Sequence, residues 1–232
     1  MSSVLIIGAS SSLGCSVMKN FSEMGYNVVA TYSGAPERII CSENISSIQL
    51  DLTCDESIAN FNSSIGLNGY TFDLCVFLAG FLPGKNIQHY DNKKIDIVMA
   101  INFSGFAKVY KYLEPAFNNN SQILIVSSIS AQRGSYDPIY AASKGALISF
   151  MKSLSQVRPL KIRANAVAPG LLEDSSMYND MEASRRLFHV DQATTGKLTN
   201  MEDLSKIIVD LSKPHWSNLN GAVIQVNGGA YV

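Results

Sequence analysis

Seven short apolar runs, rich in β-branched residues, recur along the chain and constrain its fold more than any other feature. They cover Val4 to Ile7, Asn27 to Tyr32, Ser47 to Leu50, Leu74 to Leu78, Ile123 to Ser127, Ile162 to Val167 and Val223 to Val226. The runs are continuous rather than alternating between apolar and polar residues. This pattern predicts strands that are covered on both faces, as in a parallel sheet.

Segments of helical period separate these strands. They cover Leu13 to Met24, Ser57 to Ile65, about Lys94 to Phe117, Ile139 to Val157 and Met201 to Leu211. Strands that alternate with helices predict an α/β fold with a doubly wound parallel sheet of seven strands. No repeat or Pro/Gly-rich linker divides the chain, so we expect one domain over residues 1–232. Its one long stretch without a clear period, at about 171–198, is typical of a substrate loop.

Composition and charge exclude several classes of function. The 18 basic and 19 acidic residues give a net charge of -1, too small a field for a nucleic acid or an anionic membrane. Four cysteines without a C-x-x-C pair suit a reducing compartment. There is no basic leader and no apolar run near the roughly 18 residues of a membrane span. We therefore expect a cytoplasmic protein, and no motif with metal-ligand spacing predicts a metal site.

A glycine-bounded turn, Gly8-Ala9-Ser10-Ser11-Ser12-Leu13-Gly14, follows the first predicted strand directly. Glycine at such a turn lets the backbone approach a pyrophosphate, which the free amides and the positive end of the next helix then hold. The hydroxyls of Ser10, Ser11 and Ser12 add donors. The spacing is G-x5-G rather than the common G-x-G-x-x-G, so a tight turn that binds nothing is the alternative interpretation.

Tyr140 and Lys144 lie four positions apart at the start of a predicted helix, so their side chains share one face. A lysine ammonium there is expected to lower the pKa of the phenol from about 10. A second pair of this spacing, Tyr90 with Lys94, lies in a polar stretch, and we interpret Tyr90 as a solvated surface residue. Tyr140 instead follows a strand that ends in two serines, and the carboxyl ends of parallel strands are where such sheets bind ligands.

Taken in order, these motifs resemble the short-chain dehydrogenase/reductase family, in its one-domain branch, over nearly the whole chain. The glycine turn is similar to the family's T-G-x-x-x-G-x-G. Further similarities are Asp51-Leu52 after strand three, Leu78-Ala79-Gly80 for N-A-G, Asn165 to Gly170 as N-A-V-A-P-G, and Val226 to Gly229 for V-D-G-G. The resemblance, which extends to 3-oxoacyl-carrier-protein reductases, implies a Rossmann fold. It also implies hydride transfer between NAD(P)(H) and a carbonyl or alcohol substrate.

The resemblance implies four catalytic residues. Tyr140 is the general acid or base, and Lys144 binds the ribose of the nicotinamide and tunes Tyr140. Asn102 distorts its helix and holds a water that relays protons to Lys144. Ser128 donates a hydrogen bond to the substrate oxygen. Ser127 stays an alternative, because the family's usual spacing to the tyrosine selects it, whereas the local pattern from Ser128 to Ala131 selects Ser128.

The cofactor-binding residues are also implied by the resemblance. They are Gly8, Ser10, Ser11, Ser12, Leu13, Gly14, Tyr32, Asp51, Leu52, Ala79, Gly80, Tyr140, Lys144, Pro169 and Gly170. For Asp51, capping of the next helix is the rival interpretation. Tyr32 stands where many NAD users carry an acid, and Arg38 is near in sequence, so we favour NADP over NAD.

The sequence departs from the family pattern at several positions. Ile7 replaces a threonine, Ser12 a glycine and Phe77 an asparagine, and Asp174 stands where a threonine contacts the carboxamide. A non-catalytic dinucleotide sensor with the same fold is the alternative function, because a fold does not fix a function; a broken Tyr/Lys/Ser/Asn set would favour it, and here all four residues are present. The resemblance also implies a homo-oligomer, either a tetramer or a dimer.

Overall fold

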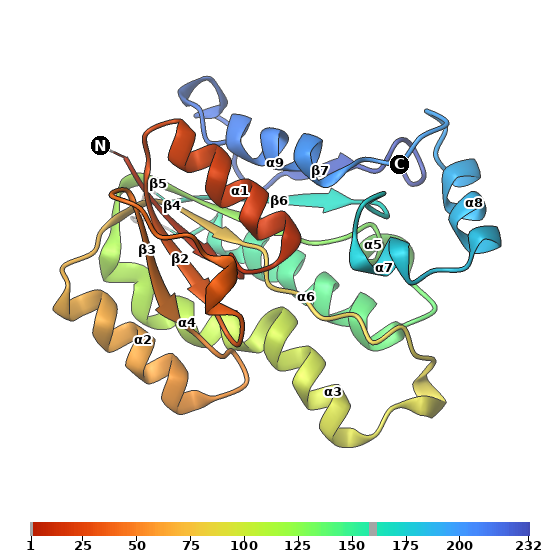
Figure 1. Ribbon diagram of the computed structural model, residues 1–232, viewed down its shortest axis with the longest axis horizontal. Helices are drawn as coiled ribbons and strands as arrows, with labels where there is room; N and C mark the ends of the chain where they lie inside the picture. The colour runs from red at the N-terminus through yellow and green to blue at the C-terminus, as the bar shows by residue number, and fades with distance from the viewer. Residues whose placement is uncertain (1, 158–161) are drawn as a thin grey trace.

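A single parallel sheet of seven strands organises the computed structural model, which describes residues 2–157 and 162–232 (Figure 1). The strands lie in the order β3-β2-β1-β4-β5-β6-β7. Their bounds are β1 Ser3–Ile7, β2 Asn27–Tyr32, β3 Ile45–Gln49, β4 Phe72–Phe77, β5 Phe117–Val126, β6 Arg163–Pro169 and β7 Val223–Val226. Every neighbouring pair is parallel. The predicted doubly wound α/β fold is therefore confirmed.

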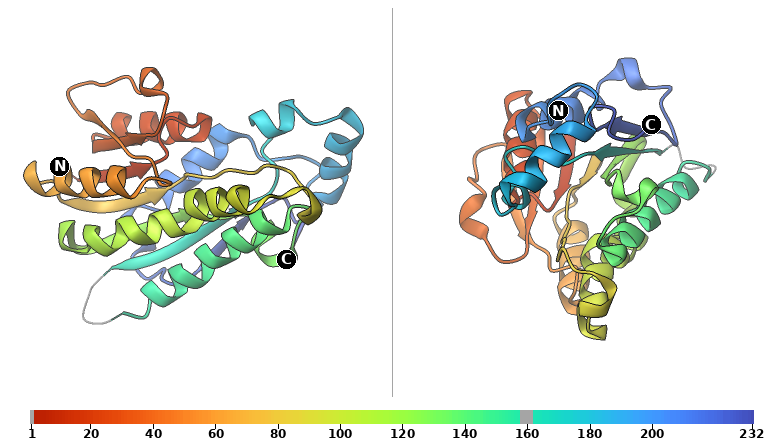
Figure 2. Two further views of the ribbon diagram at one scale, coloured as in Figure 1. Left: turned by 90° about the horizontal axis from the view of Figure 1, so that it is seen from below. Right: turned by 90° about the vertical axis from the view of Figure 1, so that its right-hand side faces the viewer.

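Helices cover both faces of this sheet, as the continuous apolar strands predict. Two helices, α1 (Ser12–Glu23) and α9 (Met201–Asp210), lie side by side on one face. Three others, α2 (Asp55–Leu67), α4 (Gly105–Leu113) and α6 (Pro138–Leu154), cover the opposite face (Figure 2, left).

The first strand shows how the two cores form. Leu5 and Ile7 pack into the core under α2, α4 and α6, whereas Val4 and Ile6 pack into the core under α1 and α9. All four side chains are almost fully buried. A strand with apolar residues on both faces is stable only between two helical layers.

The predicted helix from Lys94 to Phe117 is wrong in its continuity and in its end. The structure has α3 (Asn92–Met99), a π-helical turn (Ala100–Ser104) and then α4. Pro115, which lies in a 3-10 turn, cannot continue a helix because it lacks an amide donor, and Phe117 already belongs to β5. The apolar period continues across these changes because each helix buries one face, with Val98 of α3 and Val109 of α4 both fully buried.

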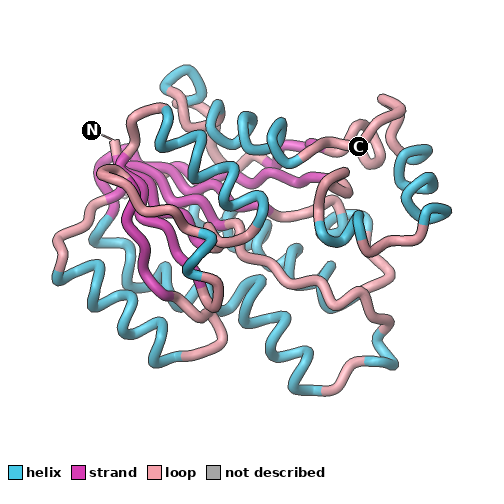
Figure 3. The backbone as a smooth tube through the Cα atoms, viewed as in Figure 1, coloured by secondary structure: helices cyan, strands magenta, loops and turns pink. Residues whose placement is uncertain are grey.

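The segment at about 171–198 contains two short helices, α7 (Ser176–Asn179) and α8 (Ala183–Gln192). They lie beyond the carboxyl ends of the strands, near α5 (Ser130–Arg133) (Figure 3). Leu172 and Thr199 form a parallel bridge, and the Thr195 amide donates to the Gly228 carbonyl at 3.1 Å. The two ends of the segment are therefore held together, and its C-terminal end is bonded to the loop after β7. Among the described helices, none is long and apolar enough to cross a membrane.

Candidate active site

The order of the strands defines the place where a ligand can bind. After β3, at one edge of the sheet, the chain crosses back and places β4 beside β1, so the strand order runs outward in both directions from this central pair. Such a reversal opens a crevice at the carboxyl ends of the strands. The Gly8 turn follows β1 at this edge, and Ala79 and Gly80 follow β4.

The Gly8 turn needs its two glycines for steric reasons. Gly8 has a φ of +91°, which favours glycine, and a Cβ there would lie 2.8 Å from the Ala79 amide nitrogen. A Cβ on Gly14 would collide with the backbone of Gly8 and Ala9. Ser11 caps α1: its hydroxyl accepts from the Gly14 amide at 3.0 Å and donates to the Gly8 carbonyl at 2.8 Å. Hydrogen bonds between residues of the turn itself therefore stabilise its conformation.

Arg38 lies against this turn, although it is distant from it in sequence. Its guanidinium donates to the Ser12 hydroxyl at 3.1 Å, and both side chains are exposed. Tyr32, at the end of β2, is half-buried, as are Ser10 and Leu13. An exposed cation therefore borders the turn on the β2 side.

Asp51 holds the turn between β3 and α2. Its carboxylate accepts from the Thr53 amide at 2.8 Å and from the Thr53 hydroxyl at 2.7 Å. The N-cap of α2 is Cys54, so the rival assignment of Asp51 as the helix cap is wrong. The neighbouring Leu52 is buried in the core below α4, where Gly105 leaves room for it.

Tyr140 and Lys144 lie on the first turns of α6, as their spacing predicts. The ammonium nitrogen of Lys144 lies 6.0 Å from the centre of the Tyr140 ring and donates to the Val126 carbonyl at 2.9 Å. Lys144 is only 3% exposed, and this burial lowers its pKa to about 8. A Cβ on Gly80 would come within 3.2 Å of the ammonium nitrogen, so glycine there leaves room beside the ammonium.

The pKa of Tyr140 moves in the direction opposite to our expectation. Burial raises the pKa of this phenol, a hydrogen bond with Ser128 lowers it in part, and the charge of Asp137 raises it further. The expected lowering of this pKa is therefore wrong: burial is the largest cause of the shift, and the ammonium of Lys144, 6.0 Å from the ring centre, does not reverse it. The phenol is protonated at neutral pH.

The two serines at the end of β5 point in different directions. Ser128 lies within hydrogen-bonding reach of the Tyr140 hydroxyl, and its own hydroxyl accepts from the Ser130 amide at 3.1 Å. The hydroxyl of Ser127 instead donates to the Lys144 carbonyl at 2.9 Å and is buried. The structure brings Ser128, rather than Ser127, to the tyrosine.

Asn102 lies in the π-helical turn between α3 and α4 and is fully buried. Its amide oxygen accepts from the Phe81 amide at 2.6 Å, and its amide nitrogen donates to the Phe81 carbonyl at 3.0 Å and to the Ser143 hydroxyl at 2.9 Å. Asn102 therefore ties the segment after β4 to α6. The distorted helix agrees with the expectation for this residue.

Asp137 is a site residue that the sequence reasoning missed. It is buried and caps α6 by accepting from the Tyr140 amide at 3.0 Å. It also accepts from the amides of Gly84 at 3.0 Å and Lys85 at 3.2 Å, and from the Tyr90 hydroxyl at 2.7 Å. The interpretation of Tyr90 as a solvated surface residue is therefore wrong: it is half-buried, and burial, together with Asp137, raises its pKa.

The remaining predicted residues, Pro169 and Gly170, lie at the carboxyl end of β6. Pro169 ends that strand and is buried, and the Gly170 amide donates to the Val226 carbonyl at 3.0 Å. Asp174 accepts from the Met201 amide at 2.9 Å, and Ser175 caps α7. Both polar side chains thus support the loop itself.

Comparisons with known proteins agree with this geometry. A family model described as Enoyl-(Acyl carrier protein) reductase matches residues 8–231. The chain belongs to the short-chain dehydrogenase/reductase family of NAD(P)-dependent oxidoreductases.

Individual relatives match over almost the full chain. The sequence is 27% identical over 238 residues to the uncharacterized oxidoreductase YmfI of Bacillus subtilis, covering 97% of both chains. It is 25% identical to the 3-oxoacyl-[acyl-carrier-protein] reductase FabG of Buchnera aphidicola, covering 98% of this chain and 96% of the relative. The crystal structure of a short-chain dehydrogenase/reductase, glucose/ribitol dehydrogenase, from Brucella melitensis superposes with a TM-score of 0.91. The two sequences are 26% identical, and the match covers 100% of the present chain and 97% of the Brucella protein.

Proposed function

We propose that this protein reduces a carbonyl group to an alcohol with NADPH, and that Tyr140 donates the proton. The observation that carries the proposal is the grouping of the Tyr140 phenol, the Ser128 hydroxyl and the Lys144 ammonium beside the glycine turn. Together they offer an acid, a hydrogen-bond donor and a positive charge at the edge of the sheet where ligands bind.

The crevice fits a dinucleotide in its steric and electrostatic properties. Gly8 and Gly14 leave the backbone open at the first turn of α1, whose positive end favours a pyrophosphate. Gly80 keeps space at the Lys144 ammonium for a ribose hydroxyl. The other residues proposed to line the cofactor are Ser10, Ser11, Ser12, Leu13, Tyr32, Asp51, Leu52, Ala79, Pro169 and Gly170. When bound, the nicotinamide supplies or accepts the hydride.

The chain's own residues move and stabilise the proton. The Tyr140 phenol is protonated at neutral pH because burial raises its pKa, so it can donate to a developing alkoxide. The phenolate that remains is stabilised by the nearby ammonium of Lys144. Ser128 donates to the same substrate oxygen, and Asn102 orients the segment after β4.

The two serines provide a matched pair of variants. Ser128→Ala should lower kcat by about 10- to 100-fold, because it removes a donor to the developing oxyanion. Ser127→Ala should lower stability by about 1 kcal/mol through its lost bond to the Lys144 carbonyl and should change kcat by less than about threefold. Steady-state kinetics and urea unfolding of both variants test the assignment. A larger kcat loss in Ser127→Ala would reverse it.

Arg38 supports the preference for NADP. Its exposed guanidinium lies 3.1 Å from the Ser12 hydroxyl and can form bidentate hydrogen bonds with a ribose 2′-phosphate. Arg38→Met should raise the Kd for NADPH by about 10-fold and leave the Kd for NADH nearly unchanged. Titration of both cofactors, followed by their fluorescence, measures the two values. Equal losses for both cofactors would contradict the preference.

The names of the relatives suggest a 3-oxoacyl thioester as the substrate class. We therefore expect oxidation of NADPH, followed at the absorbance of the reduced nicotinamide, when acetoacetyl-CoA is added. A panel of simple ketones and alcohols covers other substrates. Binding of NADPH without turnover of any of these compounds would favour the alternative function, a non-catalytic dinucleotide sensor.

Three further parts of the proposal concern the setting of the site. The segment at about 171–198 serves as the substrate loop, because α7 and α8 lie beyond the strand ends. A homo-oligomer, tetramer or dimer, and a cytoplasmic location also stay predictions. Size-exclusion chromatography with light scattering measures the first of these two.

A further inference from the structure

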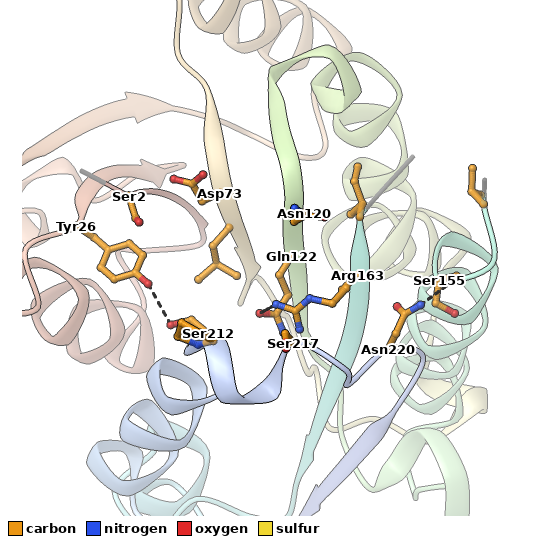
Figure 4. A pocket seen from close by; sticks show the side chains of 14 residues that line it. Ser2, Tyr26, Asp73, Asn120, Gln122, Ser155, Arg163, Ser212, Ser217 and Asn220 are labelled. Carbon is orange, nitrogen blue, oxygen red and sulfur yellow. Dashed lines mark hydrogen bonds between the residues drawn. The ribbon is translucent and has the colours of Figure 1, made fainter. Parts of the chain in front are cut away.

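A second cavity lies at the amino ends of the strands, at the opposite end of the sheet from Tyr140 (Figure 4). Its volume of about 690 Å³ is in the range of small-molecule sites. Polar side chains dominate its lining among the described residues. They include Asp73, Asn120, Gln122, Arg163, Ser217 and Asn220.

Arg163, the first residue of β6, places a positive charge at this cavity. Its guanidinium donates to the carbonyls of Trp216 at 2.9 Å and Leu219 at 3.4 Å, and to the side-chain oxygen of Gln122 at 3.4 Å. It makes no ion pair with any residue in the ranges 2–157 and 162–232. Burial lowers the pKa of Arg163. A partly buried charge without a counter-charge is unfavourable, so a bound anion would stabilise it.

Gln122 supplies an unsatisfied donor beside Arg163. The side chain is only 2% exposed, and its amide oxygen faces the guanidinium (Figure 4). Its amide nitrogen has no hydrogen-bond partner within the described part of the chain. A buried donor without a partner is unfavourable, so an acceptor at this position is favoured. Two neighbouring side chains thus both require an acceptor.

Asp73, the one carboxylate named in the lining, does not meet this requirement. Its two oxygens already accept from the Ser3 amide and from the Asn118 side chain, each at 2.8 Å. It also forms no ion pair with Arg163 in the part of the chain that the structure describes. Its position instead favours a ligand with hydroxyl or amine donors at that end.

We infer that this cavity is a binding site for a small organic anion, whose carboxylate or phosphate group is held by Arg163 and by the amide nitrogen of Gln122. The remaining polar groups of the ligand form hydrogen bonds with the hydroxyl and amide side chains that line the cavity. The site is separate from the catalytic one, because β5 and β6 run from this cavity, at Gln122 and Arg163, to their carboxyl ends at Val126 and Pro169. The inference therefore does not depend on the proposed reaction.

The single tryptophan of the chain reports on this cavity. Trp216 is not among the lining residues, but its backbone carbonyl accepts from the Arg163 guanidinium at 2.9 Å, so a change at Arg163 reaches this residue. We would titrate the full chain with inorganic phosphate, glycerol 3-phosphate and citrate, with potassium chloride at matched ionic strength as the control. Saturable changes in Trp216 emission at millimolar anion, absent with chloride, are expected. The phosphate and citrate arms distinguish the phosphate from the carboxylate as the preferred group.

Variants separate this site from the nucleotide site. Arg163→Met should weaken the anion at least about 10-fold, and Gln122→Met, which removes the unpartnered donor at similar volume, should weaken it by a smaller factor. Arg163→Lys should retain part of the affinity. Lys152→Gln, an exposed cation on α6, should leave the affinity unchanged, as should Arg38→Met. NADPH binding checks the fold of the Arg163, Gln122 and Lys152 variants, and circular dichroism checks that of Arg38→Met, whose NADPH affinity is itself expected to fall.

Three results would overturn the inference. The first is wild-type emission that responds no more to the anions than to chloride. The second is unchanged affinity in both Arg163→Met and Gln122→Met, provided that these variants still bind NADPH. The third is loss of the response in Arg38→Met, since the anion would then bind at the glycine turn.

Discussion

Replacing Tyr140 by phenylalanine should lower kcat for carbonyl reduction by at least about 100-fold, since general acid catalysis contributes about 10²- to 10⁴-fold. The phenylalanine ring fills the same space above Lys144, but it has no proton to donate. The Kd for NADPH should stay within about twofold, because the ring rather than the hydroxyl fills the site. Stopped-flow reduction of acetoacetyl-CoA and fluorescence titration of NADPH measure the two quantities separately.

Tyr90→Phe is the matched control for this variant. Tyr90 is the other phenol near the site with a raised pKa, and its hydroxyl donates to Asp137 rather than to Ser128. Its removal should therefore change kcat by less than about threefold. A Tyr140→Phe variant that keeps more than a tenth of the wild-type kcat would require another proton donor.

The fold was predictable because the strands carry their burial pattern in the sequence. Leu5 and Val4 face different helical layers, yet both are buried, and only a sheet covered on both faces explains such a run. The strand order follows from right-handed crossovers between parallel strands. The bounds were less predictable: β5 begins at Phe117, six residues before the expected start, because Phe117 and Gln122 pair with β4 on either side of a polar stretch with an irregular register.

The helix interruption at Asn102 has no local signal in the sequence. The residues from Lys94 to Leu113 keep an apolar period throughout: Val98 of α3 is fully buried where α3 packs on α6, and Phe106, Val109 and Leu113 of α4 face the core below the sheet. The π-helical turn arises from tertiary contacts: Asn102 bonds to Phe81 and Ser143, and Gly105 packs against Leu52. Contacts between segments distant in sequence are not visible in a periodicity.

The sequence predicted which residues form the candidate site, but it did not predict the direction of the pKa shift of Tyr140. The spacing of Tyr140 and Lys144 places both on one face of α6, as expected. The direction of the Tyr140 pKa shift depends on burial, which spacing does not reveal. Asp137 before Pro138 is a typical start of a helix, so its capping role could have been found. Its bonds to Gly84 and Lys85 could not.

Asp137→Ala should destabilise the protein by at least about 3 kcal/mol, because a helix cap contributes about 1 kcal/mol and each unpaired buried donor costs 1–3 kcal/mol. The substitution removes the acceptor of the amides of Tyr140, Gly84 and Lys85 and of the Tyr90 hydroxyl. Urea unfolding measures the loss. A change below about 1 kcal/mol would mean that water replaces these bonds.

A positioning role for Asp137 also predicts a shift in pH dependence, which loss of stability alone would not produce. Burial sets most of the raised pKa of Tyr140, and the negative charge of Asp137 adds to it. Asp137→Asn keeps an acceptor for the Tyr140 amide but removes that charge. The alkaline limb of kcat/KM, where the phenol loses its proton, should therefore move to lower pH, whereas Tyr90→Phe should leave the limb in place. An unmoved limb in Asp137→Asn would show that the carboxylate acts only as a structural acceptor, because any charge within reach of the phenol must change its proton affinity.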